Sequence, residues 1–435
     1  MIIEKENSSL DSELNSLFDV ERQARQTNDM DLSLATALKI LDLLRRTGDL
    51  SKLAANVTAL CNKRGQFNKT VTELVQQCMA HAETLKDPQQ KIDLISAVKN
   101  ICEKKIYLEV EYARCSMILV KYNEKDGKNL AEASKIIENV QVETYGSMSK
   151  YEKIEFILYQ MKLNILLNDN TKLYIVSRKV NTKTLEEKGF HPLKFSFYLY
   201  SFRYFFTAGD YASAASCLDN AYDAFILMTS EEVQKLDSLI LSEKFSIFLN
   251  KSRLAEGALS FKLLENFSTQ KLSDLKEKKP KYEVFLNENE ALNRLVESFL
   301  SKEITSCDPA FYLKDKVFIF ASPYEKYTEL KETLRAQLIC KNLYIASLYY
   351  KKVRIPRLST LFSADMVQIE DQLCGLIVGG KVTAKIDRPA KLIQFLHSQG
   401  QNSEVDKWTQ NVNAIVDLVD FVCERIERED VRSSG

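Results

Sequence analysis

The sequence predicts a mainly α-helical protein in which a right-handed helical-repeat solenoid, of the HEAT or tetratricopeptide (TPR) kind, is followed by a winged-helix module and a C-terminal helix. Three observations predict this fold class. The 435 residues include only 12 glycines and 7 prolines, and a chain with so few helix breakers favours helix throughout. A spacing of 41 residues recurs between turn-like sequences, and apolar residues in the tail recur every three or four positions.

The charge balance and the cysteines limit the classes of protein to consider. Lysine and arginine number 60, as do aspartate and glutamate, so the formal net charge is zero. A protein that mainly binds nucleic acid or a membrane surface would carry a basic excess. The nine cysteines form no CxxC pair and their number is odd, which favours buried thiols in the reducing cytoplasm or nucleus. We expect no signal peptide and no membrane-spanning helix.

Turn-like sequences recur at one spacing in the first half of the chain. They begin at Gly127, Asn168 and Gly209, 41 residues apart in each step, and Gly48 opens a similar unit. A period near 40 is typical of helix–turn–helix repeats, and because one pair cannot bury its own apolar face, the pairs stack into a solenoid. We assign residues 1–300 to this solenoid arm. The alternative is a helical bundle without repeats.

One charged stretch interrupts the arm. The sequence STQKLSDLKEKKP, from Ser268 to Pro280, shows no apolar face. An exposed helix is possible here, but we expect a solvated connection between the last repeats and the next module.

Residues 301–398 show the order of elements found in a winged helix. We expect a long helix over 324–351, a short strand at 353–355, a helix at 357–362, and a second helix at 364–378 that Ser363 caps. Gly379 and Gly380 then end that helix. Two strands follow, one with Val382, Ala384 and Ile386 on one side and one at 392–396. We predict these three residues as a sheet interface for a neighbouring domain, which could extend the sheet by adding a strand.

The second helix of this module argues against DNA binding. Winged helices often place this helix in the major groove, but no lysine or arginine occurs from Leu358 to Gly380, whereas Asp365, Glu370 and Asp371 do. Phosphates would repel such a helix. The GxxxxGK spacing from Gly375 to Lys381 follows a helix, and Val382 stands where a phosphate loop needs Ser or Thr. Nucleotide binding is therefore not expected.

The tail, residues 399–435, is predicted to be an assembly helix. A helix from Ser403 to Asp430 carries apolar residues in steps of 3 and 4, the a/d pattern of helices that pack against other helices. Such a helix either docks on its own protein or pairs with other chains, and the strict alternation favours a partner chain. The predicted helix-bundle interface consists of Val405, Trp408, Val412, Ile415, Val419, Val422 and Ile426.

Residues that carry chemistry are scarce. The chain has only three histidines, none of them with a metal-ligand partner at helical spacing, and it lacks GxSxG and GxGxxG motifs. A zinc site or a nucleophile pair would need such patterns. We therefore predict no catalytic, cofactor-binding or metal-binding residue, and no enzymatic activity.

The order solenoid, winged helix and terminal helix resembles the PCI family, whose members occur in the proteasome lid, the signalosome and a translation initiation factor. Within that family the chain resembles the fifth non-ATPase subunits of the proteasome regulatory particle. QVETYGSM, from Gln141 to Met148, is similar to a central signature of these subunits, and Ala384–Pro389 to their wing strand and turn. Further matching segments are Glu21–Arg25, Lys63–Gln66, Lys105–Arg114 and Glu152–Met161.

The resemblance implies a role in ubiquitin-dependent protein degradation without a catalytic residue. It implies that the winged helix joins those of other PCI-type lid subunits and that the C-terminal helix enters a shared bundle. The other partners it implies are the lid deubiquitinase, the proteasome core particle and the ATPase ring, in cytoplasm and nucleus. A subunit of a sibling complex, chiefly the signalosome, is the first alternative, and a nucleic-acid-binding winged-helix protein is the second.

Overall fold

The fold is dominated by helices, as predicted, and its contacts divide the chain into two compact units. Unit 1 comprises residues 1–208 and 220–246, and unit 2 comprises 209–219 and 247–435. The computed structural model describes residues 2–47, 49–85, 87–103, 105–125, 129–187, 189–234, 236, 240, 247–308, 327–396, 408–409, 411–416, 418–423 and 425–426.

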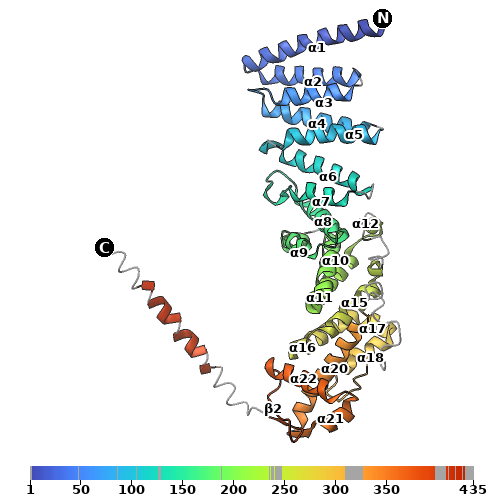
Figure 1. Ribbon diagram of the computed structural model, residues 1–435, viewed down its shortest axis with the longest axis vertical. Helices are drawn as coiled ribbons and strands as arrows, with labels where there is room; N and C mark the ends of the chain where they lie inside the picture. The colour runs from blue at the N-terminus through green and yellow to red at the C-terminus, as the bar shows by residue number, and fades with distance from the viewer. Residues whose placement is uncertain are drawn as a thin grey trace. The chain divides into compact units, whose positions relative to one another are not determined.

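Unit 1 is a succession of helices in which each packs on its near neighbours in sequence (Figure 1). This arrangement confirms the predicted helical-repeat solenoid. The helices are α1 (Ile2–Gln26), α2 (Met30–Thr47), α3 (Leu50–Cys61), α4 (Asn68–Thr84), α5 (Pro88–Cys102), α6 (Glu109–Lys125), α7 (Leu130–Glu138), α8 (Lys150–Leu166), α9 (Asn170–Ser177), α10 (His191–Ala208), α11 (Tyr211–Leu227), whose first residues belong to unit 2, and α12 (Ser230–Gln234).

The 41-residue spacing marks the turns inside successive helical hairpins. Asn168 and Gly209 have positive φ values of 56° and 77°, which stop the preceding helix. The aspartate that follows each of them caps the next helix: Asp169 accepts a hydrogen bond from the Lys172 backbone N–H at 3.0 Å, and Asp210 accepts one from Ser213 at 3.2 Å. The dipeptide therefore ends one helix and starts another. Gly127 lies outside the described residues.

Polar contacts between the hairpins also follow the repeat. Arg114 pairs with Glu152 at 2.8 Å, 38 residues away, and Lys150 pairs with Glu187 at 2.7 Å, 37 residues away. Each contact spans one repeat, because a solenoid repeat touches only its neighbours.

A buried carboxylate ties the first helix to the α3–α4 connection. The Glu21 side chain is fully buried and accepts from Arg25 at 2.7 Å and from Lys63 at 3.4 Å. Arg25 also donates to the Arg64 carbonyl at 2.8 Å. Burying this carboxylate is tolerable because both partners are present. Two of the segments that carried the family resemblance thus meet in one ion-pair cluster.

Unit 2 contains the last helices of the arm and a winged helix with the predicted order of elements (Figure 1). The domain limits 1–300, 301–398 and 399–435 stay predictions. The elements are α15 (Lys251–Leu264), α16 (Thr269–Lys278), α17 (Glu283–Glu288), α18 (Glu290–Leu300), α20 (Tyr327–Tyr349), β1 (Lys352–Arg354), α21 (Ile355–Phe362), α22 (Met366–Val378), β2 (Ala384–Asp387) and β3 (Leu392–Phe395).

The stretch from Ser268 to Pro280 is a helix, α16, so the expected solvated connection was wrong. Ser268 caps it, and Leu275 is fully buried. Two of its charges are paired: Asp274 lies 3.1 Å from Lys262, and Lys278 pairs with Asp219. Lys276 and Glu277 are exposed. Tertiary partners allow a segment with few apolar residues to pack as a helix.

Lys271 of α16 is the most deeply buried charge of this region, at 1% exposure. Its ammonium group donates to the carbonyls of Leu263 at 2.8 Å and Glu265 at 2.5 Å, at the end of α15, and lies 5.1 Å from the centre of the Phe299 ring. A cation there complements the negative end of the α15 dipole. Burial lowers the pKa of Lys271 from 10.5 to about 7.

Two adjacent residues of α20 hold the segment that follows α18. Lys341 donates to the Glu303 carbonyl at 2.6 Å. Asn342 exchanges two hydrogen bonds with the Thr305 backbone, at 3.2 and 2.6 Å. These side chains satisfy main-chain groups that would otherwise be buried without partners.

The winged helix corrects one detail of the sequence prediction. Ser363 does not cap the second helix; it has a φ of 50° and ends α21. Asp365 caps α22 instead, by accepting from the Met366 N–H at 2.7 Å. Ser363 and Asp365 both have side chains that can cap a helix. The left-handed backbone of Ser363 ends α21, and so Asp365 caps α22.

The helix caps generate a first prediction. Asp169→Ala should lower the free energy of unfolding by about 1 kcal/mol, because the first turn of α9 loses its acceptor. Asp169→Asn keeps an acceptor and should retain most of that stability. Urea unfolding followed by circular dichroism measures both; equal losses in the two variants would contradict the capping role.

Lys271 generates a second prediction. Because its pKa falls on folding, the unfolded chain binds more protons between pH 7 and 10, so its contribution makes the free energy of unfolding rise with pH there. Lys271→Met should reduce this slope by at most about 1.4 kcal/mol per pH unit. The exposed Lys276→Met is the control and should keep the wild-type slope. A wild-type slope in Lys271→Met, measured by urea unfolding from pH 7 to 9.5, would refute the assignment.

Candidate assembly surfaces

β2 is an edge strand of the three-stranded sheet of the winged helix. The strand order is β1-β3-β2, so β3 is central and β2 pairs on one side only. Lys385 and Asp387 of β2 are exposed, while Ala384 and Ile386 are half-buried. A short edge strand with charged side chains resists uncontrolled pairing. It remains open to one complementary strand.

The main-chain groups of Ala384 and Ile386 face that open edge. The Leu396 N–H donates to the Thr383 carbonyl at 2.8 Å, so Thr383 belongs to a hydrogen-bonded pair with the central strand. Such pairs alternate along an antiparallel ladder. Lys385 opposite Gln394 is therefore the next hydrogen-bonded pair. Ala384 and Ile386, on either side of Lys385, point their N–H and C=O groups away from β3.

The side chains of these residues point to one face of the sheet, at about right angles to the direction from which a partner strand would add. Ile386 pairs with the buried Ile393, which in turn pairs with Val353 of β1. This row covers the core of the module. Ala384 and Ile386 therefore lie at the predicted edge but would meet a partner through their backbone. Their interface role stays a prediction.

Val382 does not belong to the strand, so its predicted place in the sheet was wrong. It precedes β2, it is buried, and its N–H lies 3.4 Å from the Leu376 carbonyl at the end of α22. Val382 fits the apolar alternation of the strand because a buried residue that precedes a strand can have the same spacing as the residues within it.

The GxxxxGK segment is the helix end that its sequence context predicted. Gly379 caps α22 and Gly380 has a φ of 66°. The Lys381 ammonium group donates to the Phe267 carbonyl, so this lysine is used within the fold. Glu370 of α22 pairs with Arg388 of the wing at 2.5 Å.

The C-terminal helix is the largest exposed apolar surface among the described residues. Residues 408–409, 411–416, 418–423 and 425–426 are helical, and all of them are exposed. Six of the seven predicted interface residues are among these, and Val405 lies outside the described residues. Their exposed fractions are 70% for Trp408, 39% for Val412, 62% for Ile415, 52% for Val419, 46% for Val422 and 55% for Ile426.

The same helix carries apolar side chains that the heptad pattern missed. Leu418 and Phe421 are exposed at 65% and 56%, and with Ala414 they form an i, i+4, i+7 row beside the predicted one. A search for the strict a/d pattern ignores such a row; counting apolar residues around the whole helix would have found it. An apolar surface this wide exceeds what a single packed helix covers.

The described residues hold no group of acidic, histidine and cysteine side chains that could bind a metal ion. No helix in the described part of the chain combines the length and apolarity that crossing a bilayer requires.

Stacked helical hairpins followed by a winged helix define the class of helical-repeat proteins that end in a winged-helix module. Residues 12–229 match the family described as PSMD12/CSN4, N-terminal, and residues 310–397 match the PCI domain. The chain belongs to the PSMD12/CSN4 family and carries a PCI domain.

Its relatives match along nearly their whole length. The 26S proteasome regulatory subunit rpn501 of Schizosaccharomyces pombe is 28% identical over 98% of this chain and 92% of its own. The 26S proteasome non-ATPase regulatory subunit 12 of Dictyostelium discoideum is 28% identical, over 96% and 89%. The 26S proteasome regulatory subunit RPN5 of Saccharomyces cerevisiae is 27% identical, over 97% and 91%.

The strand edge generates a third prediction. Ala384→Pro should leave the hairpin folded, because its N–H points away from β3 and proline is tolerated on edge strands. Lys385→Pro should destabilise unit 2 by about 1–3 kcal/mol, because it leaves the Gln394 carbonyl without its donor. Thermal and urea unfolding compare the two. A larger loss in Ala384→Pro than in Lys385→Pro would show that the ladder alternates the other way, and equal losses would contradict the assignment of an open edge at Ala384.

Proposed function

We propose that this chain is a non-catalytic scaffold subunit of the proteasome lid. It organises the complex for ubiquitin-dependent protein degradation through winged-helix contacts and a C-terminal helix bundle. Its partners are other PCI-type lid subunits, the lid deubiquitinase, the core particle and the ATPase ring, and it acts in cytoplasm and nucleus. Its relatives are named as regulatory subunits of the 26S proteasome, which supports the assignment to this complex.

The exposed C-terminal helix carries this proposal. Nine large apolar side chains between Trp408 and Ile426 are exposed at 39% or more, and burial of each such side chain contributes about 1.5–3 kcal/mol. Isolated apolar surfaces of this size on a soluble chain mark an interaction site. The heptad spacing selects helices as the partners, and the wide apolar arc calls for more than one of them.

The signalosome is the alternative that the family itself leaves open, because its description names both PSMD12 and CSN4. The relatives that match along nearly their whole length favour the proteasome over the signalosome, since they are named as proteasome subunits. A nucleic-acid-binding role is disfavoured by α22, whose exposed side bears Asp371 and no basic residue.

The fourth prediction tests assembly. A chain that lacks residues 403–435 should lose only the helix content of the deleted segment and keep its thermal stability, because no described residue of that segment is buried, yet should fail to enter the complex. Trp408→Ala should weaken incorporation, since it removes the largest side chain of the seam. Asn413→Ala, on the polar side of the same helix, is the control.

Incorporation is measured by co-purification with the lid and quantitative mass spectrometry. Full stoichiometry of the truncated chain would sink the bundle proposal. Unchanged incorporation of Trp408→Ala alone would assign that helix an intramolecular role.

A further inference from the structure

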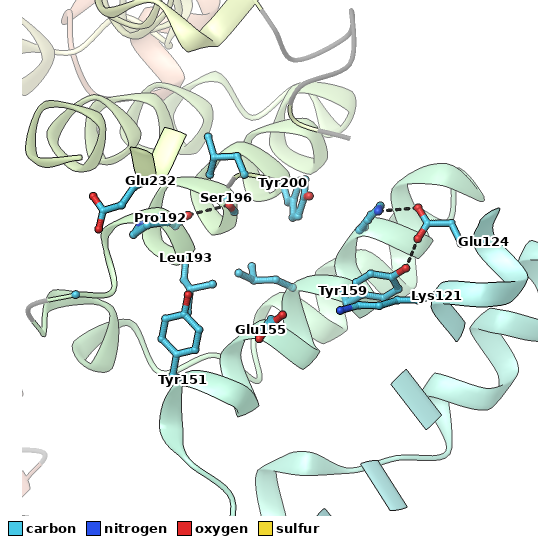
Figure 2. A pocket seen from close by; sticks show the side chains of 14 residues that line it. Lys121, Glu124, Tyr151, Glu155, Tyr159, Pro192, Leu193, Ser196, Tyr200 and Glu232 are labelled. Atoms are coloured by element: carbon cyan, nitrogen blue, oxygen red, sulfur yellow. Dashed lines mark hydrogen bonds and ion pairs between the residues drawn. The ribbon is translucent and has the colours of Figure 1, made fainter. Parts of the chain in front are cut away.

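A cavity of about 880 Å³ lies within unit 1, between helices of successive repeats (Figure 2). We call it the α8 groove because Tyr151, Glu155, Leu158, Tyr159 and Lys162 of α8 form its longest wall. These positions share one face of the helix. The end of α6, the first half of α10, α12 and the residues Gly189 and Leu236 next to these helices supply the rest. Its volume lies in the range of ligand pockets, which run from about 300 to 1,000 Å³.

The charges deep in the groove satisfy one another. The Lys162 ammonium group, 4% exposed, lies 2.6 Å from the Glu124 carboxylate. The Tyr159 hydroxyl donates to the same carboxylate. Figure 2 shows this triad at one end of the groove. A buried pair with both partners in place needs no ligand charge. The triad therefore shapes that end of the groove.

The remaining carboxylates lie on the Tyr151 side and along α8. Tyr151, 45% exposed, lies at the end opposite Lys121, Glu232 lies on the same side as Tyr151, and Glu155 lies between Tyr151 and Tyr159 (Figure 2). Glu155 has no ion-pair partner among the residues that the structure describes. Burial raises the pKa of Tyr151, and Glu155 and Glu232 raise it further, so both carboxylates act on the phenol. At the other end, Lys121 lies 5.8 Å from the centre of the Tyr159 ring.

Apolar side chains also line the groove. Leu193 and Pro192 lie on the Tyr151 side (Figure 2), and Leu158 of α8 is a further lining residue. An acidic aromatic end with apolar side chains, and Lys121 at the other end, complement a chain segment that carries a basic residue, apolar residues and an acidic residue. An aromatic ring beside carboxylates favours a lysine or arginine side chain.

We propose that the α8 groove binds an extended peptide segment of a partner protein, with a basic residue against Tyr151 and Glu155 and an acidic residue against Lys121. A peptide suits the site because the groove crosses helices from successive repeats, the surface that solenoids use for extended ligands. A nucleic acid does not, since its phosphates would meet Glu155 and Glu232. The proposal is independent of the assembly surfaces of unit 2.

The test uses the full chain and a random heptapeptide library displayed on phage. Enriched sequences are made as fluorescein-labelled peptides, and their affinity is measured by fluorescence anisotropy. We expect a basic and an acidic residue separated by apolar residues. Glu155→Lys should weaken binding by about tenfold, the effect of losing one charge-assisted contact. Lys121→Glu should act in the same direction. Glu83→Lys, exposed on α4 and outside the groove, should bind as the wild type does.

A charge exchange separates recognition from loss of folding. The double variant Glu155→Lys, Lys121→Glu should prefer the peptide whose two charges are exchanged and lose the original one. No enriched sequence, or equal binding by all variants, would overturn the proposal. Loss of both peptides by a double variant that keeps the wild-type circular dichroism would also overturn it.

Discussion

The constraint on which the rest of the structure depends is that no helical hairpin of this chain can bury its apolar face alone. Each hairpin is covered by the next, and polar contacts such as Arg114–Glu152 connect neighbours one repeat apart. The same constraint applies where the repeats stop. At the end of the chain a helix with Trp408, Leu418 and Phe421 exposed has no such neighbour among the described residues. In the function that we propose, other chains cover its apolar surface.

Buried polar groups make the packing specific. Glu21 in unit 1 and Lys271 and Lys341 in unit 2 are almost fully buried, and each reaches charged or main-chain partners. The two lysines bind carbonyls at or near helix ends, where an apolar side chain would leave these groups without donors. Such contacts determine which helix ends meet. They explain how a chain with balanced charge and long charged stretches still packs tightly.

The helical content, the hairpin turns and the order of the winged helix could be predicted from the sequence, because turn dipeptides such as Asn168–Asp169 act locally. The α16 helix could not, since partners distant in the sequence, among them Asp219, pair its charges. The β2 edge was placed correctly by alternation, yet Val382 was misplaced because burial in a turn resembles burial in a strand. The α8 groove left no motif, for its walls come from four helices.

We propose that the open backbone edge of β2 and the exposed apolar helix are the two surfaces that partner subunits cover. The most direct measurement of this claim is affinity purification of the tagged full-length chain from its own cells, followed by quantitative mass spectrometry. Our account predicts that the PCI-type subunits of the proteasome lid and the lid deubiquitinase are recovered in equal amounts with it. Recovery of signalosome subunits in their place, or of the chain alone, would contradict it.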